Sequence, residues 1–123
     1  MALQGFFKKL FGDQSERAVR PLWDRLRNEI YPISEQLVSE TNDQLRDRIN
    51  VIRDEIRSEA KTFNDEMEQL RAEIETLDYE KREPLWKRID ELREDKFKMY
   101  ARKLDEALPE VFAVVKETAR RFK

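Results

Sequence analysis

The sequence predicts an all-α protein, an elongated antiparallel helical hairpin with short N-terminal helices and a C-terminal apolar helix. Three observations favour this fold class. Charged residues make up 42% of the 123 residues and hydrophobic residues only 39%, whereas a globular domain averages about 25% charged residues. The 25 basic and 27 acidic side chains nearly cancel, which argues against disorder driven by net charge. Apolar residues recur at steps of three and four, the period of narrow helical seams.

The composition also excludes several kinds of chemistry. The chain contains neither His nor Cys, so catalytic triads, imidazole metal sites and thiolate sites lack the residues that form them. No apolar run approaches the ~20 residues of a membrane span. Lys8 and Lys9 lie inside the first apolar stretch, which reverses the order of charge and apolar run in a secretory signal. We therefore expect a cytoplasmic protein.

Two glycines and two prolines divide the first 40 residues. The glycines bracket FFKKLF at residues 6–11 as a separate element, so residues 1–12 are expected to form an N-terminal amphipathic segment. Residues 13–40 are expected to form a kinked helical segment that begins after Ser15 and is kinked, delayed or restarted at its prolines. These four residues are Gly5, Gly12, Pro21 and Pro32.

Residues 41–108 are predicted to form the long hairpin. Thr41 and Gln44 have the spacing of a capping box at a helix start. The apolar stripe that follows advances by about 3.56 residues per step, which favours a weakly supercoiled helix. The stripe comprises Leu45, Ile49, Ile52, Ile56, Ala60, Phe63, Met67, Leu70, Ile74 and Leu77.

A narrow stripe needs a partner helix to bury it. The polar stretch before Pro84 is short, so the next helix is expected to return antiparallel to the first. Its stripe comprises Leu85, Ile89, Leu92 and Met99, with Phe97, Tyr100 and Leu104 shifting it sideways.

Residues 109–123 are predicted to form a separate last helix that Pro109 opens. Its apolar face is wide enough to pack against something larger than this chain. The face comprises Phe112, Val115, Ala119 and Phe122, widened by Val111 and Val114. Arg120 and Arg121 either complement the negative end of the helix dipole or contact the same larger body.

The charge is unevenly distributed along the chain. Residues 34–110 carry a net charge of −7, whereas residues 1–33 carry +2 and residues 111–123 carry +3. Nucleic acid would need a basic stripe on the dominant element, so no nucleic-acid partner is expected. The acidic hairpin is interpreted either as a docking arm or as a solvated coiled coil.

Both ends of the chain resemble the SecA family, the motor subunit of bacterial preprotein translocase. PEVFAVVKETARRF, at residues 109–122, is similar to the family's helix that leads into the first nucleotide-binding domain. FFKKLFG, SERAVRPLWDRL and TNDQLRDRINVIRDEI resemble the family's opening. Residues 60–104 are interpreted as a helical insertion like that of Bacteroidetes-type members.

The resemblance implies a non-catalytic N-terminal region of an ATP-driven protein translocation motor. The full-length motor protein would bind ATP and magnesium. In this chain no glycine follows residue 12, so it lacks a phosphate loop. We expect no cofactor here and no ATP hydrolysis by the chain alone. The implied partners are the translocation channel, acidic phospholipid and the remaining domains of the same polypeptide, with a homodimer left open. The implied location is cytoplasmic, peripherally associated with the inner membrane.

Two candidate sites follow from the resemblance. The first would contact membrane or channel, with apolar side chains at the headgroup boundary and lysines on anionic lipid. It comprises Phe6, Phe7, Lys8, Lys9, Leu10 and Phe11. The second would meet the missing nucleotide-binding domain, and comprises Phe112, Val115, Ala119, Phe122, Arg120 and Arg121.

Each functional interpretation has a purely structural alternative. The first segment could be a terminal helix that folds back on the body. The whole chain could be a free-standing coiled-coil scaffold or adaptor that self-associates through its seams.

Overall fold

The computed structural model describes residues 2–122, with side chains at residues 5, 6 and 16–122. Within that range the secondary structure is helical without strands, which confirms the predicted all-α class. The chain divides into two units. Unit 1 combines the chain up to Thr41 with the chain from Pro109, and unit 2 is Asn42–Leu108.

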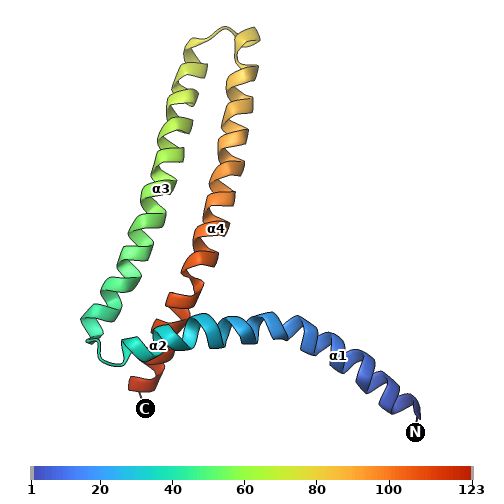
Figure 1. Ribbon diagram of the computed structural model, residues 1–123. Helices are drawn as coiled ribbons and strands as arrows, with labels where there is room; N and C mark the ends of the chain where they lie inside the picture. The colour runs from blue at the N-terminus through green and yellow to red at the C-terminus, as the bar shows by residue number, and fades with distance from the viewer. Residues whose placement is uncertain (1, 123) are drawn as a thin grey trace. The chain divides into compact units, whose positions relative to one another are not determined.

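Unit 2 is the antiparallel hairpin (Figure 1). α3 (Asn42–Thr76) begins directly after Thr41 and contains 35 residues, a length of about 52 Å at 1.5 Å per residue. The 3₁₀ turn η2 (Tyr79–Lys81) leads into α4 (Glu83–Arg121), with Pro84 in its first turn. The helix start, the short connection and the returning helix are as predicted.

The predicted stripe is confirmed, because all ten positions are buried or half-buried; nine of them are in α3, and Leu77 follows its last residue. Ile89 and Leu92 of α4 are 0% and 2% exposed. They form a cluster with Met67 and Ile74 of α3. Side chains three and four residues apart share one helix face, so each helix contributes a single row to this core.

The α4 row differs from the prediction at two positions. Phe97 is 73% exposed and Leu104 is 58% exposed, so neither belongs to the core. Lys96 and Lys103 are half-buried instead. A search for apolar residues misses them, although a lysine stem can cover apolar surface while its ammonium group reaches a polar partner.

Each of these lysines has a polar partner on α3. Lys96 Nζ donates a hydrogen bond to Asn64 Oδ1 at 2.6 Å. Lys103 Nζ lies 2.9 Å from Glu59 Oε1, and this hydrogen bond and the carboxylate's charge raise the pKa of Lys103. Polar pairs inside an apolar seam discriminate between alignments of the two helices, so these pairs favour the observed register.

Unit 1 joins the start of the chain to the last turns of α4. α1 (Ala2–Arg25) passes into a π-helical segment, η1 (Leu26–Ile30), and then into α2 (Tyr31–Leu37). The buried apolar residues of this unit are Ile30, Leu37, Ala113 and Val114. α2 and the end of α4 therefore form its core.

The start of the chain differs from the prediction, because α1 is continuous from Ala2 to Arg25. Residues 1–12 are therefore not a separate element, and the helix does not begin near Ser15. A glycine costs a helix about 1 kcal/mol relative to alanine but keeps its N–H group, so two glycines need not interrupt it. Pro21 lies inside the helix, whereas Pro32 lies in the first turn of α2, one of its two predicted places.

The predicted separate helix at residues 109–123 is also not observed. α4 runs through Pro109 without a break. A proline inside a helix costs about 3 kcal/mol, and here its ring is buried in unit 1. Packing of the ring offsets the missing backbone hydrogen bond, which the local sequence could not indicate.

The seam of unit 2 can be tested with one buried and one exposed apolar residue of α4. Ile89→Ala should lower the free energy of unfolding by about 2–5 kcal/mol, because it leaves a cavity in the core. Urea unfolding followed by circular dichroism measures this change. Phe97→Ala, which removes a larger but exposed side chain, should stay within about 0.5 kcal/mol of the wild type; equal losses would contradict the observed seam.

Candidate functional site

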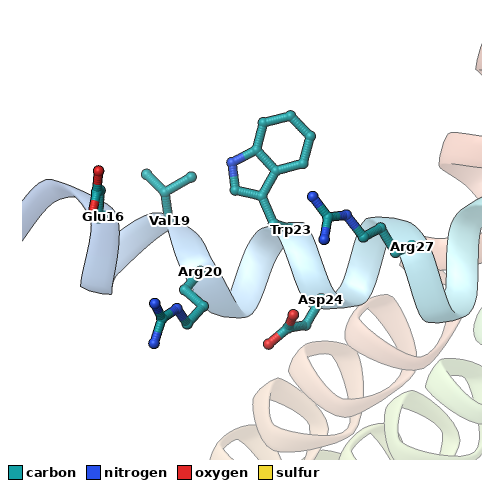
Figure 2. A pocket seen from close by; sticks show the side chains of 6 residues that line it. All are labelled: Glu16, Val19, Arg20, Trp23, Asp24 and Arg27. Carbon is teal, nitrogen blue, oxygen red and sulfur yellow. The ribbon is translucent and has the colours of Figure 1, made fainter.

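α1 presents an exposed face with an apolar centre. Every residue from 16 to 24 is exposed. Figure 2 shows Val19 and Trp23 on the same side of the helix, with Glu16 before them and Arg27 after them. Trp23 is 50% exposed, and the Arg27 guanidinium lies 5.9 Å from its ring centroid, within the range of a cation–π contact.

A neighbouring face of the same stretch, which carries Leu22 and Leu26, is only partly buried. The sequence places Leu22, Leu26 and Ile30 on one face. In the structure the exposed fraction falls from 64% at Leu22 to 7% at Ile30. Only the end of this face packs into unit 1. Exposed large apolar residues gathered on one helix indicate a binding surface. Val19 and Trp23 were not among the site residues predicted from the sequence.

Most of the predicted membrane segment lies outside the residues whose side chains are described. Phe6 is the exception and is 61% exposed. The backbone of the segment is helical and belongs to α1. The predicted residues outside the description are Phe7, Lys8, Lys9, Leu10 and Phe11.

The predicted interface at the end of α4 is an exposed face. Ala113 and Val114 are 0% and 6% exposed and belong to the buried core of unit 1. Val114, which was predicted to widen the apolar face, is therefore on the inner side instead. The four predicted apolar site residues lie elsewhere around the helix, with Phe112 51%, Val115 57% and Phe122 86% exposed and Ala119 also exposed. The end of α4 therefore has an inner packing face and an outer apolar face.

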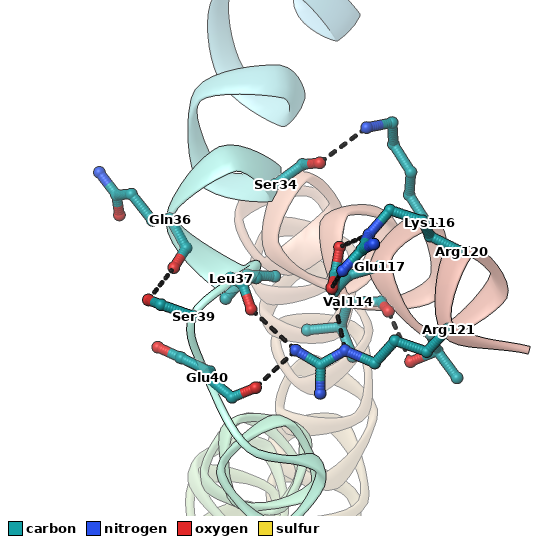
Figure 3. Close-up of polar contacts among 11 residues, drawn as sticks. Ser34, Gln36, Leu37, Ser39, Glu40, Val114, Lys116, Glu117, Arg120 and Arg121 are labelled. Carbon is teal, nitrogen blue, oxygen red and sulfur yellow. Dashed lines mark hydrogen bonds and ion pairs between the residues drawn. The ribbon is translucent and has the colours of Figure 1, made fainter.

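A buried carboxylate organises the inner face. The Glu117 side chain is 2% exposed. It accepts hydrogen bonds from Arg120 Nε and Nη2 at 2.9 and 2.7 Å and from Arg121 Nε at 2.9 Å (Figure 3). These donors lower the pKa of Glu117 to about 2, against the effect of burial.

Arg121 also connects the end of α4 to the end of α2. Its Nη2 donates to the Leu37 carbonyl oxygen at 3.0 Å and to the Glu40 carbonyl oxygen. The Leu37 carbonyl oxygen also accepts a hydrogen bond from the Glu40 N–H at 3.0 Å, and a basic side chain can add a further donor at the end of a helix. The two arginines therefore do more than complement the dipole of α4. They also do not both point outward, because only Arg120 is largely exposed, at 56%.

Lys116 provides a second connection between these helices. Its Nζ donates to Ser34 Oγ at 2.8 Å and lies 5.1 Å from the Tyr31 ring centroid. Together with Arg121, it holds α2 from both ends. The spacing of Glu117, Arg120 and Arg121 at i, i+3 and i+4 was a signal for local pairing, but it could not show that α2 completes the cluster.

Neither a metal-binding cluster nor a membrane-spanning helix is found among the described residues. Among residues 5, 6 and 16–122, no three acidic side chains are placed to hold a metal ion. No helix of the described part is long and apolar enough to cross a membrane. In unit 1, Glu117 pairs with Arg120 and Arg121. The large exposed apolar residues of this unit include Val19 and Trp23 of α1, Val38 after α2, and Phe112, Val115 and Phe122 of α4.

Comparisons with known proteins point to one family. No family profile matches the chain, and no solved structure does. Among curated proteins, the protein translocase subunit SecA of Porphyromonas gingivalis is 36% identical over 99% of the chain. SecA of Amoebophilus asiaticus is 37% identical over 95% of the chain, and SecA of Flavobacterium psychrophilum is 30% identical over 98%.

The predicted resemblance to SecA is confirmed. The chain spans 11% of the length of each of these three SecA proteins. Since the match with the Porphyromonas protein covers 99% of the chain, it includes residues 60–104. The hairpin segment therefore has a counterpart in SecA of that organism.

The Glu117 cluster makes unit 1 sensitive to acid. Because the pKa of Glu117 falls from 4.5 to about 2 on folding, its stabilisation is complete above pH 4.5 and is lost as pH falls towards 2. Glu117→Gln should therefore lower the melting temperature most above pH 5 and hardly at all near pH 2. Thermal melts from pH 2 to 7 measure this difference.

Glu68→Gln provides the control, because Glu68 is an exposed carboxylate on α3. It should leave the melting temperature near that of the wild type throughout the range. A Glu117→Gln effect of constant size at every pH would contradict the paired carboxylate.

Proposed function

We propose that this chain is the N-terminal region of a SecA-type protein translocation motor. The observation that carries the proposal is the match to SecA along nearly the whole chain at 30–37% identity. The exposed apolar faces of α1 and α4 support it, because such faces on a small helical unit need a partner. The region would attach the motor and buttress its nucleotide-binding domain rather than catalyse a reaction.

The attachment role belongs to the start of α1. Phe6 is exposed, and the sequence continues with two phenylalanines, a leucine and two lysines up to residue 11. This composition suits a helix that lies at the surface of an anionic bilayer or a membrane channel. In this proposal the protein is cytoplasmic and peripherally associated with the inner membrane.

The buttressing role belongs to the outer face of α4. Phe112, Val115 and Phe122 are at least half exposed, while Glu117 and Arg121 hold the opposite side of the helix against α2. The outer face is thereby presented on a supported helix. Its proposed partner is the nucleotide-binding domain of the same polypeptide; in the isolated chain it would pair with a second copy, which sedimentation at high concentration would detect.

The residues of this chain do not fit an ATP or magnesium site. No glycine follows residue 12, so a phosphate loop cannot form, and the described carboxylates form no group that suits a metal. In this proposal, ATP would bind to the part of the full-length motor protein that lies outside this segment.

The reading frame beyond Lys123 tests the proposed function. A glutamine motif followed by a glycine-rich phosphate loop with Lys and Thr should appear within a few dozen residues. A stop codon directly after Lys123 would instead favour the free-standing scaffold, for which the self-contained hairpin of unit 2 is the supporting observation.

Liposome flotation tests the attachment role. The chain should float with phosphatidylglycerol-containing vesicles, and deletion of residues 1–12 should abolish flotation. Each lysine contributes about 1 kcal/mol near an anionic surface, so Lys8→Gln with Lys9→Gln should weaken binding roughly 25-fold.

The matched control replaces two exposed lysines near the hairpin turn, Lys81→Gln with Lys87→Gln. This variant loses the same charge and should bind vesicles like the wild type. Flotation that survives the deletion of residues 1–12 would refute the attachment role.

A further inference from the structure

η1 marks a change in helix geometry between an exposed helix and a packed one. Residues 16–24 of α1 are all exposed, whereas Ser34 and Leu37 of α2 are buried. In between, Tyr31 N–H donates to the Leu26 carbonyl oxygen, which is an i to i+5 bond. A π-helical turn holds one residue more than the α-helical turn it replaces, and such turns occur frequently at functional sites.

Two prolines weaken the backbone bonding around this turn. Pro21, inside α1, has no N–H for the Arg17 carbonyl, and Pro32 has none for the Asn28 carbonyl. Across the turn, Arg25 Nε lies 2.9 Å from Glu29 Oε2, an ion pair between positions four residues apart on the same helix.

We propose that η1 is a joint about which α1 changes its orientation relative to α2. When η1 converts between π-helix and α-helix, its backbone hydrogen-bonding register shifts by one residue. One residue corresponds to about 100° of helix rotation, so α1 rotates by about that angle around its axis. The Val19 and Trp23 stripe then turns towards or away from a surface, while Ile30, Leu37 and the Glu117 cluster stay packed. The joint would let α1 fit a docking surface without disturbing the core of unit 1.

Spin labels on the full chain test the joint. Because the chain has no cysteine, Arg17→Cys with Glu35→Cys places one label on each side of η1. The distance distribution between them should be broad or have two components, since a label lies off the helix axis and moves when the helix rotates. The control pair, Arg53→Cys with Arg71→Cys, has the same separation of 18 residues within α3 and should give one narrow distance near 27 Å.

Deletion of Asn28 provides the decisive variant. Asn28 is exposed and lies within η1, so its removal should convert the π turn to regular α-helix, narrow the distribution between positions 17 and 35, and preserve the melting temperature. Pro32→Ala restores one donor and should also narrow the distribution. Equally narrow distributions in the wild type and the control pair would overturn the proposal, as would loss of unit 1 folding in the deletion variant.

Anionic vesicles add a separate arm to the experiment. If α1 docks on these vesicles, the distance distribution between the labels at positions 17 and 35 should narrow to one component. Failure of the protein to float would refute the attachment role, but the distribution in solution would still decide the existence of the joint.

Discussion

Burial of narrow apolar stripes is the constraint on which both units depend. With 42% charged residues, the chain can offer each helix only one row of apolar side chains, so no helix can bury its row alone. α3 and α4 pair their rows in unit 2, and Ile89 and Leu92 lie at the centre of that seam. In unit 1, α2 and the end of α4 do the same on a smaller scale.

Polar groups inside these cores add specificity to the apolar contact. A buried charge is costly unless it is paired, and Glu117 is paired by two arginines. One of them, Arg121, also donates to the carbonyl oxygen of Leu37, the last residue of α2. Lys96 and Lys103 play a comparable part in unit 2, because each reaches one α3 partner. These interactions distinguish the observed alignment of the helices from neighbouring alignments that bury similar apolar area.

The small number of apolar residues per helix also explains why function is expected at exposed surfaces. After the stripes are paired, Val19, Trp23, Phe112 and Phe122 stay exposed, and the described residues provide no metal-binding cluster. We propose that these exposed residues contact other parts of a larger protein. The similarity to SecA of Porphyromonas gingivalis, of which the chain spans 11%, agrees with that interpretation.

The periodicity of the sequence determined the all-α class, the ten-position stripe from Leu45 to Leu77 and the hairpin turn before Pro84, because these features follow from local spacing and backbone chemistry. The family resemblance was likewise readable from short motifs at the two ends. Only the tertiary structure decided that α4 continues through Pro109, that Lys103 rather than Leu104 lies in the seam, and that Glu117 is buried. Each of these outcomes depends on a partner helix distant in sequence, whose packing outweighs the preference of the local segment.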